Sequence, residues 1–434
     1  MYIPSEAVWA PRSEPESRIE LSRRPLGRQL VAVAGLFAVS RIFSTVLLLI
    51  GTWLVVARGG HIPWLTTTPT FWTHDGTWLP HIPTLADVSD LWDGARYQSI
   101  AQSGYPLHLP RTASGAVIPN TWAFLPLFPY LVAALQVVFG TGFATTGSVV
   151  ALFFGVAATM MLFVVVRDRV GYRPAWFAAT IFAFGPLAFL LQTAYAESLF
   201  LFLMFAALYL MQRRMYWWMM LPAGLAAFTR PGEIALALAL GIVFLVRWRD
   251  SRRAVPAAVL AGDRPDPFPL RERVAMICAA GVSAATGAAW PVVAWLVTGT
   301  PNAYTATELS WRDGFLGHTD FRIFTAWFAL AGRYLGVGGV LIVVLTIGLF
   351  ALWVGRRGIR PLGVEIVATV TSYALYLLAV FMPQQSIFRV AMPLAPMMGD
   401  PRIVERAWLR RLILFVAVAS QPVCVAVLWF YANP

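Results

Sequence analysis

The sequence predicts an all-α, polytopic integral membrane protein with about 11 transmembrane helices (roughly 10–12). Apolar residues make up 59% of the 434 residues, whereas about 45–50% is usual in soluble domains. Charged residues make up 12%, whereas about 25% is usual. The polar surface of such a chain is too small to cover a water-soluble body.

The first predicted span, residues 31–57, follows a polar tail at residues 1–30 that we expect to lie in the cytoplasm. This apolar run is too long for the hydrophobic part of a signal peptide, and no clear cleavage site follows it. We interpret residues 31–434 as a single transmembrane domain. A span needs about 20 apolar residues, and the further candidates, several of them short or interrupted by proline, are residues 145–166, 174–191, 197–212, 217–230, 232–247, 274–298, 323–354, 361–381, 387–400 and 412–431.

The positive charges indicate how these spans are oriented. All 33 basic residues are Arg, and the net charge is +12. These Arg lie between apolar runs and not on a polar face interleaved with aromatic residues, so we expect no nucleic-acid partner. If residues 121–139 only dip into the outer leaflet, 24 of the 33 Arg fall on the cytoplasmic side, as the positive-inside rule requires. The scheme leaves two outer loops, residues 58–120 and 299–322.

A short helix that does not span is predicted within the first outer loop, over residues 91–102. Ser89 and Asp90 offer an N-cap, and Gly104 followed by Pro106 provides a stop. The i, i+3, i+4 spacing places three functional side chains on one face of this helix: Asp93, Arg96 and Tyr97.

Charged residues at the ends of the other spans complete a candidate site. Such charges are costly in a membrane and tend to be paired or functional. The alternative is a structural ion pair, such as Glu197 with Arg230. One carboxylate with several guanidinium groups suits sugar transfer from a polyprenyl-phosphate sugar to a hydroxyl. The phosphate leaving group needs no general acid, one carboxylate deprotonates the acceptor, and Arg forks hold the phosphate.

Metal-dependent and hydrolytic chemistry fit the sequence less well. A glycosidase needs two cooperating carboxylates, and the DxD pattern common in enzymes that use nucleotide sugars does not occur. The spacing of the five His and two Cys matches no metal motif. We expect neither a metal nor a cofactor, with the lipid-linked sugar as co-substrate.

Residues 91–105, LWDGARYQSIAQSGY, resemble the WDxxxYxxIAxxGY element of the PIG-V family, which comprises the GPI mannosyltransferase II group and its bacterial relatives. Three more segments resemble the family's elements in the same order: FLPLFP at 124–129, YAESLF at 195–200 and LAAFTRP at 225–231. A weaker match is FRVAMPLAP at 388–396, where the family has Arg-Tyr at the position of Phe-Arg-Val.

The resemblance implies a GT-C type fold and an inverting mannosyltransferase that uses polyprenyl-phosphate mannose on the extracytoplasmic face. It implies that Asp93 is the general base. The residues that we expect to bind the substrates are Trp92, Arg96, Tyr97, Tyr195, Glu197, Arg230, His318 and Arg389.

The all-Arg, Ala- and Gly-rich composition is typical of a high-GC bacterium, which places the protein in a bacterial plasma membrane. The acceptor is then expected to be a glycolipid or lipoglycan of the envelope. Two alternatives remain open at this point: a GT-C enzyme for another prenyl-linked sugar, such as arabinofuranose, and a lipid-linked sugar transporter without chemistry.

Overall fold

The computed structural model describes residues 25–57, 84–261, 268–317 and 320–430, and within these ranges it is helical and contains no β-strand. Five described helices are long and apolar enough to cross a membrane, which confirms the prediction of an all-α, multi-pass membrane protein. They are α2 (Leu26–Ala57), α6 (Phe143–Val170), α11 (Leu270–Thr298), α14 (Ala326–Gly355) and α18 (Ala407–Cys424).

The remaining elements connect or extend these helices. The longer ones are α5 (Leu127–Phe139), α7 (Tyr172–Phe184), α8 (Glu197–Gln212), α9 (Tyr216–Ala227), α10 (Ala235–Ala261) and α15 (Val364–Val380). The short α-helices are α3 (Leu85–Ser89), α4 (Asp93–Ser103), α12 (Ala303–Ser310), α13 (Asp313–Leu316), α16 (Ile387–Val390) and α17 (Pro401–Glu405). The 3₁₀ turns are η1 (Thr121–Ala123), η2 (Ala188–Gln192), η3 (Arg357–Leu362) and η4 (Met392–Gly399), and η5 (Val425–Trp429) is a π-helical turn.

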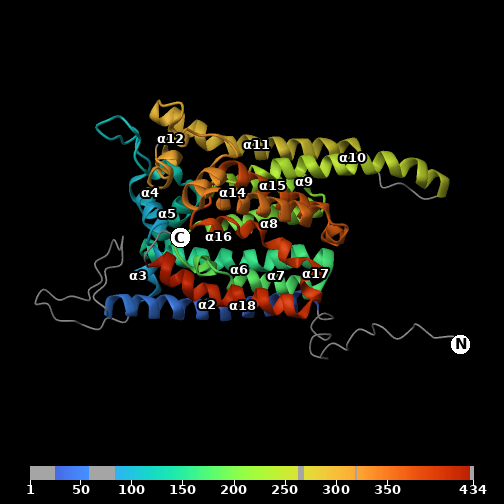
Figure 1. Cartoon of the computed structure of the whole chain (residues 1–434), viewed down its shortest axis with the longest axis horizontal. Coiled ribbons are helices and arrows are strands. Elements are labelled where there is room, and N and C mark those ends of the chain that lie inside the picture. Colours follow the sequence, from blue (N-terminus) through green and yellow to red (C-terminus); the bar gives the residue numbers. More distant parts are fainter. Residues whose placement is uncertain (1–24, 58–83, 262–267, 318–319, 431–434) are drawn as a thin grey trace, which may run out of the picture.

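The long helices run side by side along the bundle (Figure 1). α6 packs against α2, α7 and α8, while α10 packs against α11 and α15. Small side chains allow these close contacts, because membrane helices approach one another through Ala and Gly faces. In α7, for example, four Ala side chains are essentially fully buried: Ala175, Ala178, Ala179 and Ala183.

Three predicted spans differ from the observed elements. Residues 387–400 were predicted as one span, which is wrong: α16 has four residues and the 3₁₀ turn η4 follows it. Pro393 and Pro396 explain the difference, because neither can donate a backbone hydrogen bond. The span predicted at 174–191 is broken after α7, and α14 has a non-helical residue at Gly336 with φ of 57°.

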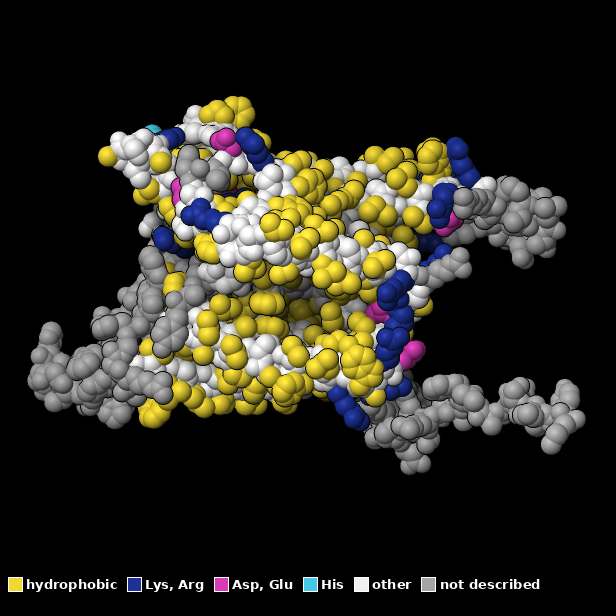
Figure 2. Space-filling view, in the orientation of Figure 1, with side chains coloured by type: hydrophobic (Ala, Val, Ile, Leu, Met, Phe, Trp, Pro, Cys, Tyr) yellow, Lys and Arg dark blue, Asp and Glu magenta, His cyan; other side chains and the backbone are white. Residues whose placement is uncertain are grey.

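The basic loops that the sequence places on one side of the membrane meet at one end of the bundle. Ion pairs join them across the chain: Arg213 to Asp168 at 2.6 Å and Arg169 to Glu365 at 2.8 Å. The indole N–H of Trp353 donates to Asp400 at 3.1 Å. Figure 2 shows dark blue Arg side chains gathered at this end, beside the yellow apolar flank. The outer-loop helices α4 and α12 lie at the other end (Figure 1).

Candidate active site

The turn before α4 directs Asp93 into the protein. Trp92 has φ of 56°, in the left-handed region that large side chains rarely adopt. Strain of this kind costs about 1–3 kcal/mol and is typical of functional sites. The Trp92 indole N–H donates to the Trp429 carbonyl oxygen at 2.8 Å, which fastens the turn to η5. Asp93 therefore lies in the first turn of α4, as predicted.

The predicted N-cap of this helix is wrong. Ser89 ends α3, and Asp90 is the residue that caps the C-terminus of α3. The sequence favoured Ser89 and Asp90 because both are good N-cap residues, but a tight turn separates them from α4. Burial raises the pKa of Asp90 to about 6. The predicted stop is confirmed, since Gly104 caps α4 with φ of 70°.

Tyr195 holds the turn before α4 through hydrogen bonds of its hydroxyl. Its side chain is fully buried, and its hydroxyl donates to the Leu91 carbonyl at 3.0 Å while accepting from the Asp93 N–H at 3.2 Å. Its ring also packs on Trp429, with centroids 5.6 Å apart. These contacts make Tyr195 a positioning residue for Asp93, and its predicted contact with substrate stays a prediction.

A break between α7 and α8 brings Tyr195 and Glu197 to this place. Helical hydrogen bonding stops after Phe184, and the backbone carbonyls at the break turn into the bundle. Arg41 of α2 is buried and donates to the carbonyls of Ala183, at 2.7 Å, and of Ala188. Buried carbonyls need such partners in a membrane. Arg41 is thus held within the bundle and does not extend to the interface.

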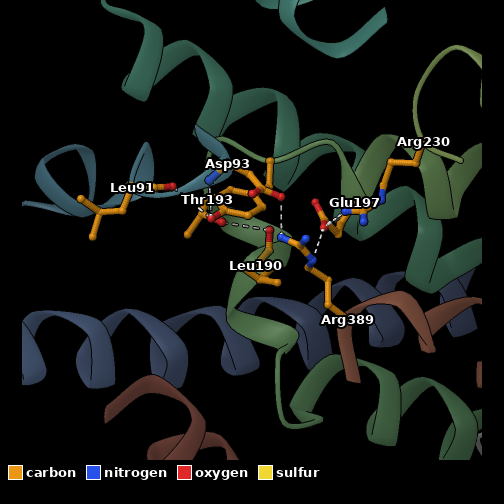
Figure 3. A network of polar contacts seen from close by, with 8 residues as sticks. Leu91, Asp93, Leu190, Thr193, Glu197, Arg230 and Arg389 are labelled. Atoms are coloured by element: carbon orange, nitrogen blue, oxygen red, sulfur yellow. Dashed lines mark hydrogen bonds and ion pairs between the residues drawn. The ribbon is translucent and has the colours of Figure 1, made fainter. Parts of the chain in front are cut away.

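Four charged side chains from four elements form one network (Figure 3). Arg389 Nη1 donates to Asp93 Oδ2 at 2.6 Å, and Arg389 Nε lies 3.3 Å from Glu197 Oε1. Arg230 pairs with the same Glu197 oxygen. All four side chains are between 3% and 13% exposed. The ion pair of Glu197 with Arg230, considered from sequence as a structural alternative, is therefore present.

This network borders a cavity of about 270 Å³. Its polar lining residues are Asp93, Tyr97, Thr229, Arg230, Tyr304, Thr305, Glu308, Arg312, Tyr373, Tyr376, Gln384, Ser386 and Arg389. Burial raises the pKa of Tyr97 to about 12, so at neutral pH its hydroxyl is a hydrogen-bond donor and not a base. A pocket of this size with convergent polar groups is the usual form of a small-molecule site.

Sequence reasoning missed part of this lining. Glu308 and Arg312 fall in the predicted second outer loop, where the sequence predicts a role only for His318, and it predicts none for Tyr304, Tyr373 and Tyr376. The available signals were the i, i+4 spacing of Glu308 and Arg312 and the i, i+3 spacing of the two Tyr hydroxyls in α15. Burial raises the pKa of the Glu308 carboxyl.

Comparison with known proteins gives a likeness in structure but none in sequence. No family model matches the chain, and no curated protein matches it. A crystal structure of the Archaeoglobus fulgidus oligosaccharyltransferase, in complex with Zn and sulfate, is similar at 14% sequence identity and a TM-score of 0.45. The match covers 92% of this chain and 53% of that one, so this chain spans about half the length of the archaeal protein.

The predicted site residues differ in their positions relative to the cavity. Four of them line it directly: Asp93, Tyr97, Arg230 and Arg389. Glu197 lies behind them and pairs with both Arg, whereas Trp92 and Tyr195 brace the backbone. The Arg96 guanidinium lies over the Trp311 ring, 5.5 Å from its centroid. His318 lies outside the described residues.

The charges of the network define what the cavity can accommodate. Its two carboxylates balance its two guanidinium groups, and Glu308 and Arg312 add one charge of each sign. Among the residues that the structure describes, Arg389 Nε makes no hydrogen bond of good geometry and the buried Glu197 Oε2 has no hydrogen-bond partner. Buried polar atoms usually have hydrogen-bond partners, so these two atoms call for an explanation. In the described part of the chain, no three His, Cys, Asp or Glu form a group that could hold a metal ion.

Proposed function

We propose that this protein is a GT-C type glycosyltransferase that transfers mannose from polyprenyl-phosphate mannose to a hydroxyl of a lipid-linked glycan acceptor. The observation that carries the proposal is that the Asp93 carboxylate faces the cavity beside the guanidinium groups of Arg230 and Arg389, which come from separate segments of the chain. It is the set of groups that transfer from a sugar phosphate requires.

The reaction assigned to these groups is a displacement at the sugar C1. The acceptor oxygen forms a bond to C1 while the bond from C1 to the phosphate oxygen breaks, with inversion. The acceptor proton passes to Asp93, and the electron pair leaves with the lipid phosphate. Arg389 and Arg230 neutralise the charge that develops on this phosphate, and forked Arg–phosphate hydrogen bonds also fix its orientation.

The ion pair of Arg389 with Asp93 suggests the order of these events. A phosphate that enters beside Arg389 competes with Asp93 for the same N–H groups, because both are oxyanions. As the donor phosphate takes over Arg389, the Oδ2 of Asp93 becomes available to the acceptor hydroxyl. Glu197 continues to hold both Arg at the correct separation.

The resemblance to the PIG-V family gains support from where the matching segments lie. Residues from four of the five segments line one cavity: Asp93 and Tyr97, Phe124 and Leu125, Thr229 to Pro231, and Arg389 and Val390. The fifth segment contributes Glu197, which pairs with Arg230 and Arg389. The convergence of segments about 300 residues apart in sequence on one cavity supports the interpretation that they serve one site.

The identities of the sugar and of the acceptor are more specific than the reaction type, and they are proposed on other grounds. Mannose and a bacterial envelope acceptor, reached from the outer face of the plasma membrane, come from the sequence resemblance and the Arg distribution. A GT-C enzyme for another prenyl-linked sugar, such as arabinofuranose, would have the same charged groups. A transporter of lipid-linked sugars would have no use for a carboxylate positioned by a strained turn.

The test is turnover in liposomes with radiolabelled polyprenyl-phosphate mannose and a membrane lipid extract as acceptor source. Asp93→Asn is nearly isosteric and removes the proton acceptor, so the rate should fall by about 10²–10⁴-fold. Asp90→Asn is the matched control. Its raised pKa indicates an environment that favours a neutral side chain, so this variant should keep near wild-type transfer.

Two results would contradict the proposal. If Asp93→Asn keeps near-full transfer while Glu197→Gln abolishes it, the base is Glu197. If the wild-type protein does not cleave mannose from any prenyl phosphate but moves the intact lipid across the bilayer, the protein is a transporter. Replacing the donor by polyprenyl-phosphate arabinofuranose distinguishes the two sugar classes.

A further inference from the structure

The cavity contains a second polar group that the proposed chemistry does not use. It consists of Tyr304 and Glu308 on α12 and of Trp311 and Arg312 directly after it, and we name it the α12 cluster. The Glu308 carboxyl interacts with the Tyr304 hydroxyl and with the Arg312 guanidinium. The indole N–H of Trp311 is buried and has no hydrogen-bond partner among the described residues.

The α12 cluster is held rigidly. The Asn120 amide donates to the Thr307 hydroxyl at 3.0 Å, which joins α12 to the start of η1. Arg312 donates to the Val380 carbonyl at 2.7 Å, which joins the end of α12 to α15. Trp311 packs edge-on against Phe124, with ring centroids 6.0 Å apart. A binding site requires side chains that are fixed by their surroundings in this way.

The composition of the α12 cluster indicates what binds there. A carboxylate accepts hydrogen bonds at two oxygens and so suits two neighbouring hydroxyls. The Trp311 N–H supplies a donor, and Tyr304, Trp311 and Tyr376 supply flat apolar faces that carry polar edges. Neighbouring hydroxyls on a ring with apolar C–H faces are the features of a sugar or cyclitol. An alcohol with one hydroxyl would leave several buried groups unpaired.

We infer that the α12 cluster is the acceptor subsite, and that Glu308 binds a hydroxyl pair of a sugar or cyclitol headgroup next to the oxygen that Asp93 deprotonates. The inference rests on the proposed function, since it takes the Asp93 end of the cavity as the place of transfer. Asp93 and Glu308 line the same cavity, and they are close enough for the Asp93 charge to act on the Glu308 carboxyl. Glu308 acts as a binding and specificity residue, and the proton is transferred to Asp93.

The first test uses the purified full chain in nanodiscs, with polyprenyl-phosphate mannose as donor. The acceptor probes are octyl α-mannoside and octyl α-glucoside, with 1-octanol as the monohydroxyl control. Wild type should transfer to at least one glycoside and at least 100-fold more slowly to octanol, because a site built for hydroxyl hydrogen bonds rejects a ligand that lacks them. Equal transfer to octanol would overturn the inference.

The second test separates acceptor binding from chemistry. In Glu308→Gln the KM for the glycoside should rise by about 10- to 100-fold, the usual effect of losing hydrogen bonds to a charged group. Donor hydrolysis in the absence of acceptor should change far less. Glu308→Asp keeps the charge and should recover part of the loss. Glu405 is an exposed carboxylate on α17. The variant Glu405→Gln is therefore the control, and its KM for the glycoside and its rate of donor hydrolysis should match those of wild type.

A parallel fall of transfer and donor hydrolysis in Glu308→Gln would mean that Glu308 supports the fold and not the acceptor. If wild type uses no lipid-phosphate sugar at all, the proposed function fails, and the inference is then decided by binding. Saturation-transfer NMR with octyl α-mannoside should show contact in wild type and a loss of contact in Glu308→Gln. Equal binding in both proteins would refute the subsite.

Discussion

Arg389 is the residue on which the charge network depends. It contacts Asp93 of α4 and Glu197 of α8, and the Arg389 guanidinium lies 5.8 Å from the centre of the Tyr195 ring. Removing it would leave two buried carboxylates without a cation between them, which is costly in a low-dielectric site. Its planar fork also provides several donors in fixed directions, which a single ammonium group does not.

Replacing Arg389 or Arg230 by Lys tests whether these forks bind the donor phosphate. Lys keeps the positive charge but loses the paired geometry, so the KM for the polyprenyl-phosphate donor should rise by about tenfold or more. The KM for the acceptor should change less. The measurement is initial-rate kinetics with each substrate varied in turn.

Arg111→Lys is the control for the two Lys variants, because Arg111 is exposed and its guanidinium donates to the Gly115 carbonyl of its own loop. It should leave both KM values unchanged. If donor kinetics are also unchanged in Arg389→Lys and Arg230→Lys, these residues serve a structural ion pair and the phosphate binds elsewhere.

Among the helices, the break between α7 and α8 decides the position of the site. An unbroken helix would carry Tyr195 and Glu197 onward in helical register and away from α4. The break leaves carbonyl oxygens inside the bundle without α-helical partners, and Arg41 donates to two of them. The Gln421 amide of α18 donates to a third, that of Gly185, at 3.1 Å. The first and last long helices thus hold the break that positions the site.

The variant Arg41→Met removes these donors and leaves buried carbonyls unpaired. Each unpaired buried group costs about 1–3 kcal/mol, so we expect a clearly lower melting temperature in detergent and a reduced transfer rate. Binding of substrate should weaken together with turnover, because both Tyr195 and Glu197 shift.

Arg333→Met is the matched control, since Arg333 is an exposed Arg on α14. This variant should melt and react as wild type does. A wild-type melting temperature for Arg41→Met would show that water or neighbouring side chains satisfy the break without Arg41.

At the scale of the whole molecule, the Arg-rich loops and the candidate site lie at opposite ends of the helix bundle. The Arg-rich loops meet at one end of the bundle, and the helices α4 and α12, whose residues line the cavity, lie at the other. The positive-inside rule assigns the Arg-rich end to the cytoplasm. With that orientation, the cavity would open outward, as the proposed function requires.

Cysteine labelling tests this orientation after Cys278 and Cys424 are replaced by Ala. A membrane-impermeant maleimide should label Thr112→Cys, in the first outer loop, from outside intact cells. It should label Glu405→Cys, on α17, only after the membrane is opened. Both positions are exposed. Labelling of Glu405→Cys alone from outside would invert the topology and the proposed access route.

The sequence by itself determined the local properties of this protein. Apolar composition and length predicted the membrane helices, and the glycine that ends α4 was predicted at Gly104. Asp93 lies in the first turn of that helix, as predicted, although α4 begins at Asp93 and not at the expected Leu91. These features follow from backbone propensity and from the cost of placing polar groups in lipid, and both act over a few residues.

Only the tertiary structure decided how the site is assembled. Arg389 reaches Asp93 across 296 positions of the sequence, and no periodicity encodes that distance. The 3₁₀ turn at 392–399, the break held by Arg41 and the α12 cluster also depend on neighbours supplied by remote helices. A buried charge or carbonyl acquires its conformation from the partner that satisfies it, and that partner is fixed only when the helices pack.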